Sequence, residues 1–413
     1  MKKVAIIGTG ISGLSAAYKL KDDYDVHLFE AGNYIGGHTN TLEVKENNKT
    51  LNIDTGFIVF NDWTYPNFIK LMDELGVESQ VSDMSFSVKC EESGLEYNGT
   101  SLNTLFAQRR NMLKPSFWKM IKDILNFNKA ALLWLEQADV NDATTLGQYI
   151  EPYGDLFRDK YILPMTAAIW SAGRESSLNF PLRFYLNFFK NHGFLSVDER
   201  PVWRVIKNGS KAYIPKIIAG FEDKIYLECP VISVKRLKGG VSLSTKRGEE
   251  FFDGVIFSCH SDQALKILGD ATQEEQDILG AIPYQANEAI LHTDQSVLPK
   301  RPLAWAAWNY HLTGQVSDLA SLTYNMNILQ SLDCEKSYNV SLNYDKIDKS
   351  KIIRKISYSH PVFTLEGVKA QKRHSEISGV NNTFFAGAYW SYGFHEDGAM
   401  SGLKAAEQLR GIL

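Results

Sequence analysis

The 413-residue chain has little of what marks disulfide-stabilised, metal-binding or nucleic-acid-binding proteins. Its four cysteines are far apart and form no CxxC pair, which argues against a disulfide framework or a zinc site and fits a reducing cytosol. Acidic residues outnumber basic residues 48 to 44, so the basic excess of a duplex nucleic-acid binder is missing. No uninterrupted apolar run reaches the ~18 residues of a membrane-spanning helix. We therefore expect a cytoplasmic protein without a nucleic-acid partner and without a bound metal.

Aromatic residues are the one excess, because 22 Phe, 19 Tyr and 8 Trp make 49 of 413 residues. This excess indicates a large core or a surface that lines something large and apolar. The length allows two or three domains. Apolar runs predict a strand at residues 4–7, a helix at 14–20 and a strand at 26–29. Residues 62–200 look mostly helical, strands recur over 202–255 and 282–364, and a strand at 383–386 precedes a helix from about residue 398.

A glycine-rich turn joins the first predicted strand to the first predicted helix. It reads Gly8-Thr-Gly10-Ile11-Ser12-Gly13, and Glu30 ends the next strand. Gly8 permits the tight turn, Gly10 lets the backbone approach a diphosphate, and Gly13 lets helix and strand pack closely. The helix N-terminus offers free N–H groups to the phosphates, and a carboxylate at the end of the second strand can accept hydrogen bonds from a ribose. The turn therefore predicts dinucleotide binding.

A second glycine pair indicates which dinucleotide is bound. Residues 31–39 read AGNYIGGHT, and an acid followed by a short loop and a double glycine resembles the flavoprotein amine oxidase and carotenoid desaturase superfamily. In that superfamily the glycine pair runs beside the flavin diphosphate, and the next residue is usually a phosphate-facing Arg, where this chain has His38. The resemblance implies FAD contacts from Ala31, Gly36, Gly37, His38 and Thr39.

The C-terminal segment resembles the closing FAD motif of the same superfamily. Residues 384–388 read FFAGA and residues 398–406 read GAMSGLKAA, although the usual acid is replaced by Ala388. The resemblance implies cofactor contacts from Gly387, Gly398 and Ala399, and a main-chain contact from Val231 on the adenine side. A second GxGxxG is absent, so a separate NAD(P)H domain is disfavoured and a single FAD is expected.

Four further stretches, residues 53–57, 297–305, 322–327 and 388–398, resemble one bacterial branch of FAD-binding oxidoreductases. That branch is associated with cyclopropane-fatty-acid-synthase-type methyltransferases, and the furan fatty acid desaturase and the oxidase-like part of plant cyclopropane fatty acid synthases are similar. The resemblance implies an α/β fold in which a Rossmann-like FAD domain, of amine oxidase and p-hydroxybenzoate hydroxylase-like topology, is interleaved with an α+β substrate domain. We expect the FAD domain at 1–61, 200–268 and 375–413, and the substrate domain at 62–199 and 269–374.

The resemblance leaves three functions open. The first is desaturation of a methyl-branched or otherwise modified fatty acyl chain by hydride transfer to flavin N5, with a lipid methyltransferase as partner. The second is oxidation of a small amine, because a C–H beside nitrogen is also a good hydride donor. Many amine oxidases place a Lys on a substrate-domain strand, but residues 287–291, matched loosely to that strand, contain none. The third is a non-catalytic, flavin-bound partner of a methyltransferase.

Two segments favour a lipid. Residues 105–135 carry six bases against one acid, with aromatic and aliphatic residues between them, which is typical of a helix that docks on the inner face of a membrane. An ordinary helix with a solvated basic face would show the same pattern. Residues 180–194 gather aromatic side chains that could line an acyl tunnel or fill a core. The six bases are Arg109, Arg110, Lys114, Lys119, Lys122 and Lys129, and the acid is Asp123.

The residues before the closing helix are the candidate catalytic group. We expect Trp390, Tyr392 and His395 around the reactive face of the flavin, with His395 as a general base, a hydrogen-bond donor to the flavin or a structural residue. Asp54 is expected to be structural. The histidines His260, His311 and His360 stand alone in the sequence and are expected to be structural as well.

Overall fold

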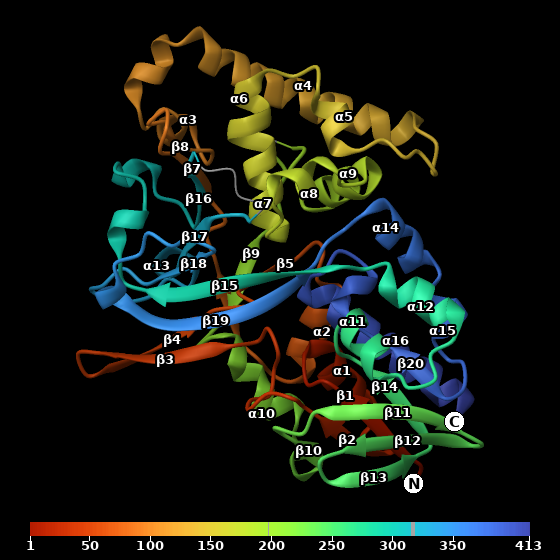
Figure 1. Cartoon of the computed structure of the whole chain (residues 1–413). Helices are drawn as coiled ribbons and strands as arrows, with labels where there is room; N and C mark the ends of the chain where they lie inside the picture. Colours follow the sequence, from red (N-terminus) through yellow and green to blue (C-terminus); the bar gives the residue numbers. More distant parts are fainter. Residues whose placement is uncertain (197, 315–318) are drawn as a thin grey trace.

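The computed structural model describes residues 1–196, 198–314 and 319–413, and it contains two principal sheets (Figure 1). The first sheet has the order β10-β2-β1-β14-β20, and every neighbouring pair in it is parallel. Its strands come from three distant parts of the chain. They are β1 (Lys3–Ile7), β2 (Asp25–Phe29), β10 (Ile225–Tyr226), β14 (Gly254–Phe257) and β20 (Thr383–Phe385).

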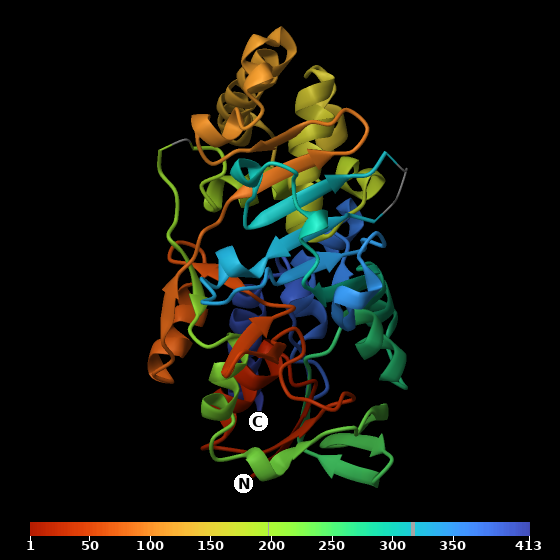
Figure 2. The same cartoon turned by 90° about the vertical axis from the view of Figure 1, so that its left-hand side faces the viewer.

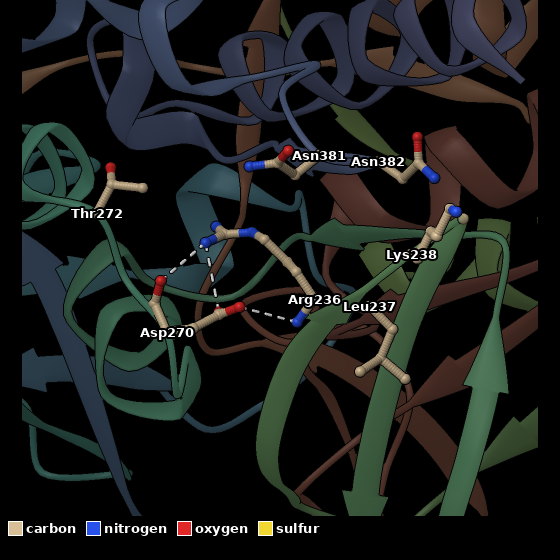
Figure 3. Close-up of a pocket in the computed structure, with 8 residues that line it drawn as sticks. Arg236, Leu237, Lys238, Asp270, Thr272, Asn381 and Asn382 are labelled. Carbon is tan, nitrogen blue, oxygen red and sulfur yellow. Dashed lines mark hydrogen bonds and ion pairs between the residues drawn. The ribbon is translucent and has the colours of Figure 1, made fainter.

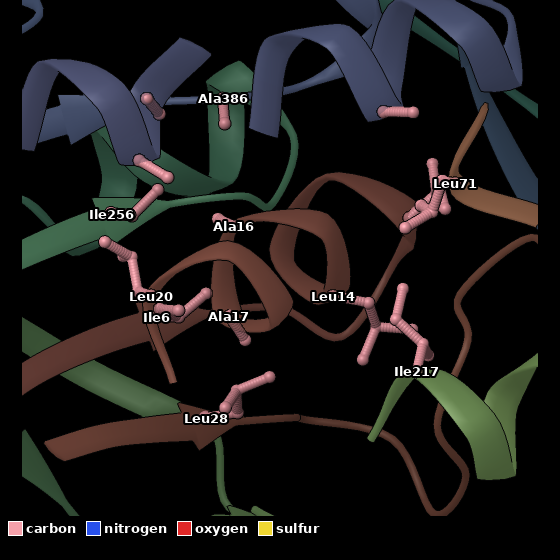
Figure 4. Close-up of a cluster of buried hydrophobic side chains, with 14 of the residues drawn as sticks. Ile6, Leu14, Ala16, Ala17, Leu20, Leu28, Leu71, Ile217, Ile256 and Ala386 are labelled. Atoms are coloured by element: carbon pink, nitrogen blue, oxygen red, sulfur yellow. The ribbon is translucent and has the colours of Figure 1, made fainter. Parts of the chain in front are cut away.

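The alternating direction of the side chains along β1 explains which elements pack on each face of this sheet. Val4 and Ile6 face a cluster with α1 (Ile11–Leu20) and α16 (His395–Ile412), shown in Figure 4. Ala5 and Ile7 face a second cluster with the antiparallel sheet of β11 (Val231–Leu237), β12 (Gly240–Thr245) and β13 (Gly248–Phe252). Because successive strand residues point to opposite faces, a continuous apolar run is buried on both sides.

The second sheet has seven strands in the order β19-β15-β18-β17-β16-β7-β8. Its longest pair, β15 (Tyr284–His292) with β19 (Ile352–Pro361), crosses the middle of the molecule between the parallel sheet and the helical end (Figure 1). Among the strand pairs in the described part of this sheet, only β7 with β16 is parallel. The other strands are β7 (Phe86–Cys90), β8 (Glu96–Asn98), β16 (Trp308–Leu312), β17 (Leu322–Asn325) and β18 (Asn339–Leu342).

Helices cap the end of the molecule opposite both termini, with α4 (Pro115–Gln137) at the extremity (Figures 1 and 2). Aromatic side chains from α4 to α9 fill the core of this end. No helix in the described ranges is long and apolar enough to cross a membrane. The helices here are α3 (Leu102–Leu105), α5 (Leu146–Ile150), α6 (Asp155–Phe157), α7 (Leu163–Trp170), α8 (Arg174–Leu178) and α9 (Leu182–Asn191).

Smaller elements connect these layers. A hairpin of β3 (Thr41–Glu46) and β4 (Lys49–Asp54) and a short sheet in the order β5-β9-β6 lie beside the second sheet. The short sheet consists of β5 (Val59–Asn61), β9 (Trp203–Ile206) and β6 (Ser79–Val81). The remaining helices are α2 (Pro66–Glu74), α10 (Ile214–Ile217), α11 (Ser261–Ile267), α12 (Gln273–Gly280), α13 (Met326–Leu329), α14 (Leu365–Lys372) and α15 (His374–Ile377).

The structure differs from the sequence expectations in three places. The first helix begins at Ile11 and not at residue 14, because the glycine-rich turn itself provides its N-terminus. The closing helix begins at His395 and not near residue 398, since the Asp397 carboxylate accepts a hydrogen bond from the Phe394 N–H (2.9 Å) and caps the first turn. The region 62–200, expected to be mostly helical, also supplies β6, β7 and β8 to sheets formed with distant strands.

Candidate functional site

In the glycine-rich turn, Gly8 and Gly13 are tightly surrounded by other atoms and Gly10 is not. A Cβ on Gly8 would lie 2.9 Å from the Ser258 carbonyl oxygen, and one on Gly13 would lie 2.1 Å from the Gly8 carbonyl oxygen. Gly8 also has a φ of +103°, which disfavours a side chain. A Cβ on Gly10, by contrast, would meet nothing within 4 Å. Gly10 therefore exposes its backbone to open space at the N-terminus of α1, where a phosphate binds best.

Glu30 ties this turn to its surroundings. Its Oε2 accepts hydrogen bonds from the Thr9 N–H (3.0 Å) and the Thr9 hydroxyl (2.6 Å), and its Oε1 accepts from the Gly32 N–H (2.8 Å). The Glu30 carbonyl accepts from the Cys229 N–H (2.8 Å), which brings the approach to Val231 and β11 alongside. These hydrogen bonds hold the turn in position. A carboxylate has about four acceptor positions, so one acceptor position of Glu30 is left for a ribose hydroxyl.

The second glycine pair lies directly against the first turn. Gly36 and Gly37 have φ values of +130° and +58°, and a Cβ on Gly37 would lie 3.3 Å from the Gly10 Cα. A Cβ on Gly36 would lie 2.6 Å from the Thr39 carbonyl oxygen, so neither position accepts a side chain easily. Ala31, at the start of this loop, is exposed. Two segments separated by more than 20 residues thus form one glycine-lined wall around Gly10.

The closing helix packs on the start of α1. A Cβ on Gly398 would lie 2.7 Å from the Ile11 Cγ2, and a Cβ on Gly402 would lie 2.1 Å from the Ser12 carbonyl oxygen. The Gly387 N–H donates to the Ser401 hydroxyl (3.0 Å), and Ala399 is buried. The N-termini of α1 and α16 therefore meet beside Gly10. These helix ends and the two glycine loops fit a diphosphate, the group that a dinucleotide cofactor would place there.

Three histidines lie together next to this cradle, and we refer to His38, His260 and His360 as the histidine cluster. The His38 ring centroid lies 5.3 Å from that of His360 and 6.4 Å from that of His260, and it stacks on Tyr358 at 4.8 Å. The Nε2 atom of His38 is buried and makes no hydrogen bond among the described residues. The expectation that His260 and His360 stand alone is therefore wrong, because the fold joins segments that are far apart in the chain.

The predicted catalytic group does not converge. Trp390 packs against His374 at 4.5 Å in the core beside β11–β13, whereas Tyr392 packs against Phe184 at 4.6 Å in the helical core. His395 points into a third cluster, against α2 and α10. The three side chains that we expected around one reactive face therefore lie in three separate clusters. The turn between them, in which Gly393 has a φ of +90°, sends neighbouring side chains in different directions.

His395 has the surroundings of a structural residue. Its ring stacks on Phe57 with centroids 3.6 Å apart, and its Nε2 lies 3.1 Å from both the Thr39 hydroxyl and the Tyr213 hydroxyl. Burial lowers the pKa of His395 to about 3, so the ring is neutral at physiological pH. His395, the first residue of the closing helix, is therefore connected to the loop after the glycine pair and to Tyr213, which directly precedes α10.

Asp54 and most aromatic side chains of residues 180–194 are buried. Asp54 is fully buried, and its Oδ1 accepts from the Thr41 hydroxyl, the Ser210 N–H and the Ser210 hydroxyl, so its role is structural as expected. The aromatic side chains of residues 180–194 pack on one another, as Tyr185 does on Phe189 at 4.2 Å, and on rings outside the segment, as Phe188 does on Trp170 at 4.6 Å. They belong to the aromatic core of the helical end.

A surface pocket of about 520 Å³ lies away from the cradle, along the edge of β11 and β12 (Figure 3). Its Arg236 is paired with Asp270 at 3.3 Å and also with Glu275, so its positive charge is already neutralised. His311 lies far from the cluster as well, in the second sheet, where its Nε2 lies 2.7 Å from the Thr323 hydroxyl. Neither feature belongs to the cofactor cradle.

Known proteins resemble the chain in sequence and in fold. A family model described as "Flavin containing amine oxidoreductase" matches residues 11–332. Zeta-carotene desaturase from Zea mays is 35% identical in an alignment of 371 positions that covers 81% of this chain but only 58% of the maize protein.

Solved structures match over nearly the whole chain. Cyclohexylamine oxidase from Brevibacterium oxydans IH-35A has a TM-score of 0.73 at 15% identity and covers 99% of both chains. The CLA-producing fatty acid isomerase from P. acnes has a TM-score of 0.69 at 16% identity, over 98% of this chain and 97% of its own. These likenesses confirm the predicted α/β fold with a Rossmann-like cofactor domain.

Proposed function

Because the chain belongs to the flavin-containing amine oxidoreductase family, and is an FAD-dependent oxidoreductase, we propose that it desaturates a methyl-branched or otherwise modified fatty acyl chain of a membrane lipid. The observation that carries this proposal is the outer face of α4. Two relatives bear names that fit it, a desaturase and a fatty acid isomerase.

Helix α4 is apolar on two sides. Its inner side chains are buried, and Phe127 contacts Phe157 with ring centroids 5.3 Å apart. On the opposite side Trp118, Leu125 and Leu132 recur every seventh residue, so they form one outward stripe about 21 Å long. Their side chains are 48%, 52% and 37% exposed. A solvated helix face would be polar here, so the stripe favours contact with a second apolar phase.

The charged residues around the stripe indicate which kind of apolar surface it contacts. Lys122 and Lys129 lie between the apolar residues on the same face, and both are exposed. The one acid of the segment, Asp123, is held by Lys119 (2.8 Å) and by the Gly154 N–H (3.2 Å). None of the other five bases of the segment makes an ion pair within the described ranges of the chain. An apolar stripe with unpaired lysines matches an anionic phospholipid surface.

The reaction that we propose removes two hydrogens from the acyl chain. A C–H next to an alkene leaves as hydride and the neighbouring carbon loses a proton to water, so that a new C=C bond forms. FAD, when bound, accepts the hydride at flavin N5. The chain's own residues would hold the cofactor: Gly10 and Gly37 would approach the diphosphate with backbone, and Glu30 would accept from the ribose. A lipid methyltransferase acting earlier would supply the branched chain, as the partner predicted from the sequence.

Anaerobic reduction of the flavin tests the proposal. The purified holoprotein is mixed with vesicles containing a methyl-branched unsaturated phospholipid, and separately with a panel of small amines. We expect the absorbance of the oxidised flavin to disappear with the vesicles and not with the amines. Reduction by an amine alone would assign the chain to the amine oxidases. A flavin that no lipid reduces would leave only the role of a non-catalytic partner.

A further inference from the structure

The histidine cluster is a group of titratable side chains beside the cradle that the proposed reaction does not use. Two of its members flank the phosphate turn. His38 follows Gly37, which lies against Gly10. His260 comes two residues after Ser258, whose hydroxyl donates to the Gly8 carbonyl (3.0 Å). The third member, His360, reaches the same place from the long strand β19.

Hydrogen bonds determine which ring nitrogen of His360 carries the proton. The Asn343 amide donates to the Asn287 Oδ1 (2.7 Å), so the Asn287 Nδ2 is the donor in its contact with the His360 Nδ1 (2.9 Å). The Nδ1 of neutral His360 must therefore accept, and the proton resides on Nε2. His360 thus offers an N–H donor, and His38 offers a buried Nε2 without a partner. Both are suited to an acceptor that arrives with a ligand.

Among the described residues, the surroundings give the histidine cluster one nearby anionic group, at His260, and none at His38 or His360. His38 faces His260, His360, His395 and Tyr358, none of which is anionic at neutral pH. Asp262 is the acidic group near His260, and His360 faces His260 and the Asn287 amide. Burial lowers the pKa of His38 well below its usual range and that of His360 to about 4. Without a ligand the rings are neutral, and a nearby anion would favour their charged form.

We propose that His38, His260 and His360 bind the diphosphate of FAD, and that the cluster takes up a proton from solvent when the diphosphate arrives. A neutral cluster thereby replaces the fixed cation that an arginine after the glycine pair would supply. A neutral cluster costs little to desolvate before FAD binds, whereas a fixed cation would have to be buried unpaired. The consequence is that FAD affinity depends on pH.

Calorimetry of FAD binding to the flavin-stripped protein tests this inference. Titrations at pH 7 in two buffers of different ionisation enthalpy measure proton uptake directly, and we expect uptake approaching one proton per FAD. Where uptake is complete, the Kd of FAD increases about tenfold per pH unit. The variant H38R carries a fixed charge and should bind FAD with a Kd that is flat between pH 6 and pH 8. The control H192Q, altered in the helical core, should keep the dependence of the wild type.

Two results would overturn the inference. One is a wild-type Kd that does not change between pH 6 and pH 8 together with no proton exchange. The other is an H38R protein that keeps the pH dependence of the wild type. If H38R does not fold, the two-buffer measurement on the wild type still decides. The inference requires only FAD binding, so it can fail while the acyl substrate is correct, and it can hold while the substrate is an amine.

Discussion

Reversing the charge of Lys122 and Lys129 should release the protein from anionic membranes. Each lysine near such a surface contributes about 1 kcal/mol, so K122E/K129E removes two attractions and adds two repulsions of similar size, ~4 kcal/mol in total. At low ionic strength this corresponds to a roughly thousandfold weaker partition coefficient, and less at higher salt because the charges are screened. Trp118 adds an apolar contribution: half of a side chain of ~200 Å² at ~25 cal/mol/Å² is ~2.5 kcal/mol.

Co-sedimentation with vesicles of mixed phosphatidylglycerol and phosphatidylcholine measures this effect. Both lysines are exposed and unpaired, so the melting temperature should change little. The matched control is K70E/K211E, which changes the net charge equally at two exposed lysines outside α4. The control should sediment like the wild type. Equal loss of binding in both double variants would mean that net charge alone decides, and unchanged binding of K122E/K129E would refute a docking role for α4.

Three further results are expected. Gly10→Ala should fold normally and lose FAD affinity by more than about tenfold, because its methyl group enters the open cradle. Gly13→Ala should instead lower the melting temperature, because its Cβ would meet the Gly8 carbonyl. Flavin fluorescence measures the first effect and thermal melts measure the second. Phe127→Ala should cost about 3–5 kcal/mol of stability in denaturant unfolding, and Leu125→Ser on the outer face less than ~1 kcal/mol; equal costs would contradict the two-sided helix. The free energy of unfolding should fall as the pH drops from 6.5 toward 4. Burial lowers the pKa of histidines such as His311 (to about 3), so the unfolded state binds more protons than the folded state in this pH range. A melting temperature that does not change between pH 6.5 and pH 4 would contradict this prediction.

The cofactor cradle could be predicted from the sequence because its residues are specified locally. Gly8, Gly10 and Gly13 follow a strand and open a helix within one short segment, and such turns need glycine for steric reasons that do not depend on the rest of the fold. The family resemblance also implied that the glycine pair and the closing motif belong to the same site. The close packing of Gly37 on Gly10 and of Gly398 on Ile11 required the structure.

The histidine cluster could not be found by spacing, because residues 38, 260 and 360 meet only through the order of the strands. One signal was present in the sequence. His38 stands where the family has an arginine, and His260 follows a buried strand of the parallel sheet, whose loops gather at the carboxyl edge. The separation of Trp390, Tyr392 and His395 has the opposite cause. Residues close in sequence were expected to share one direction, and a tight turn separates them.

Mass spectrometry of membrane lipids is the most direct test of the proposed function. Lipids are compared between cells that produce the wild-type chain and cells that produce G10D, a variant expected to fold without binding FAD. With the wild type, a modified acyl chain should appear that is lighter than its precursor by two hydrogens, and with G10D the precursor should accumulate. Identical lipid profiles, with the flavin still reducible by small amines, would contradict the account.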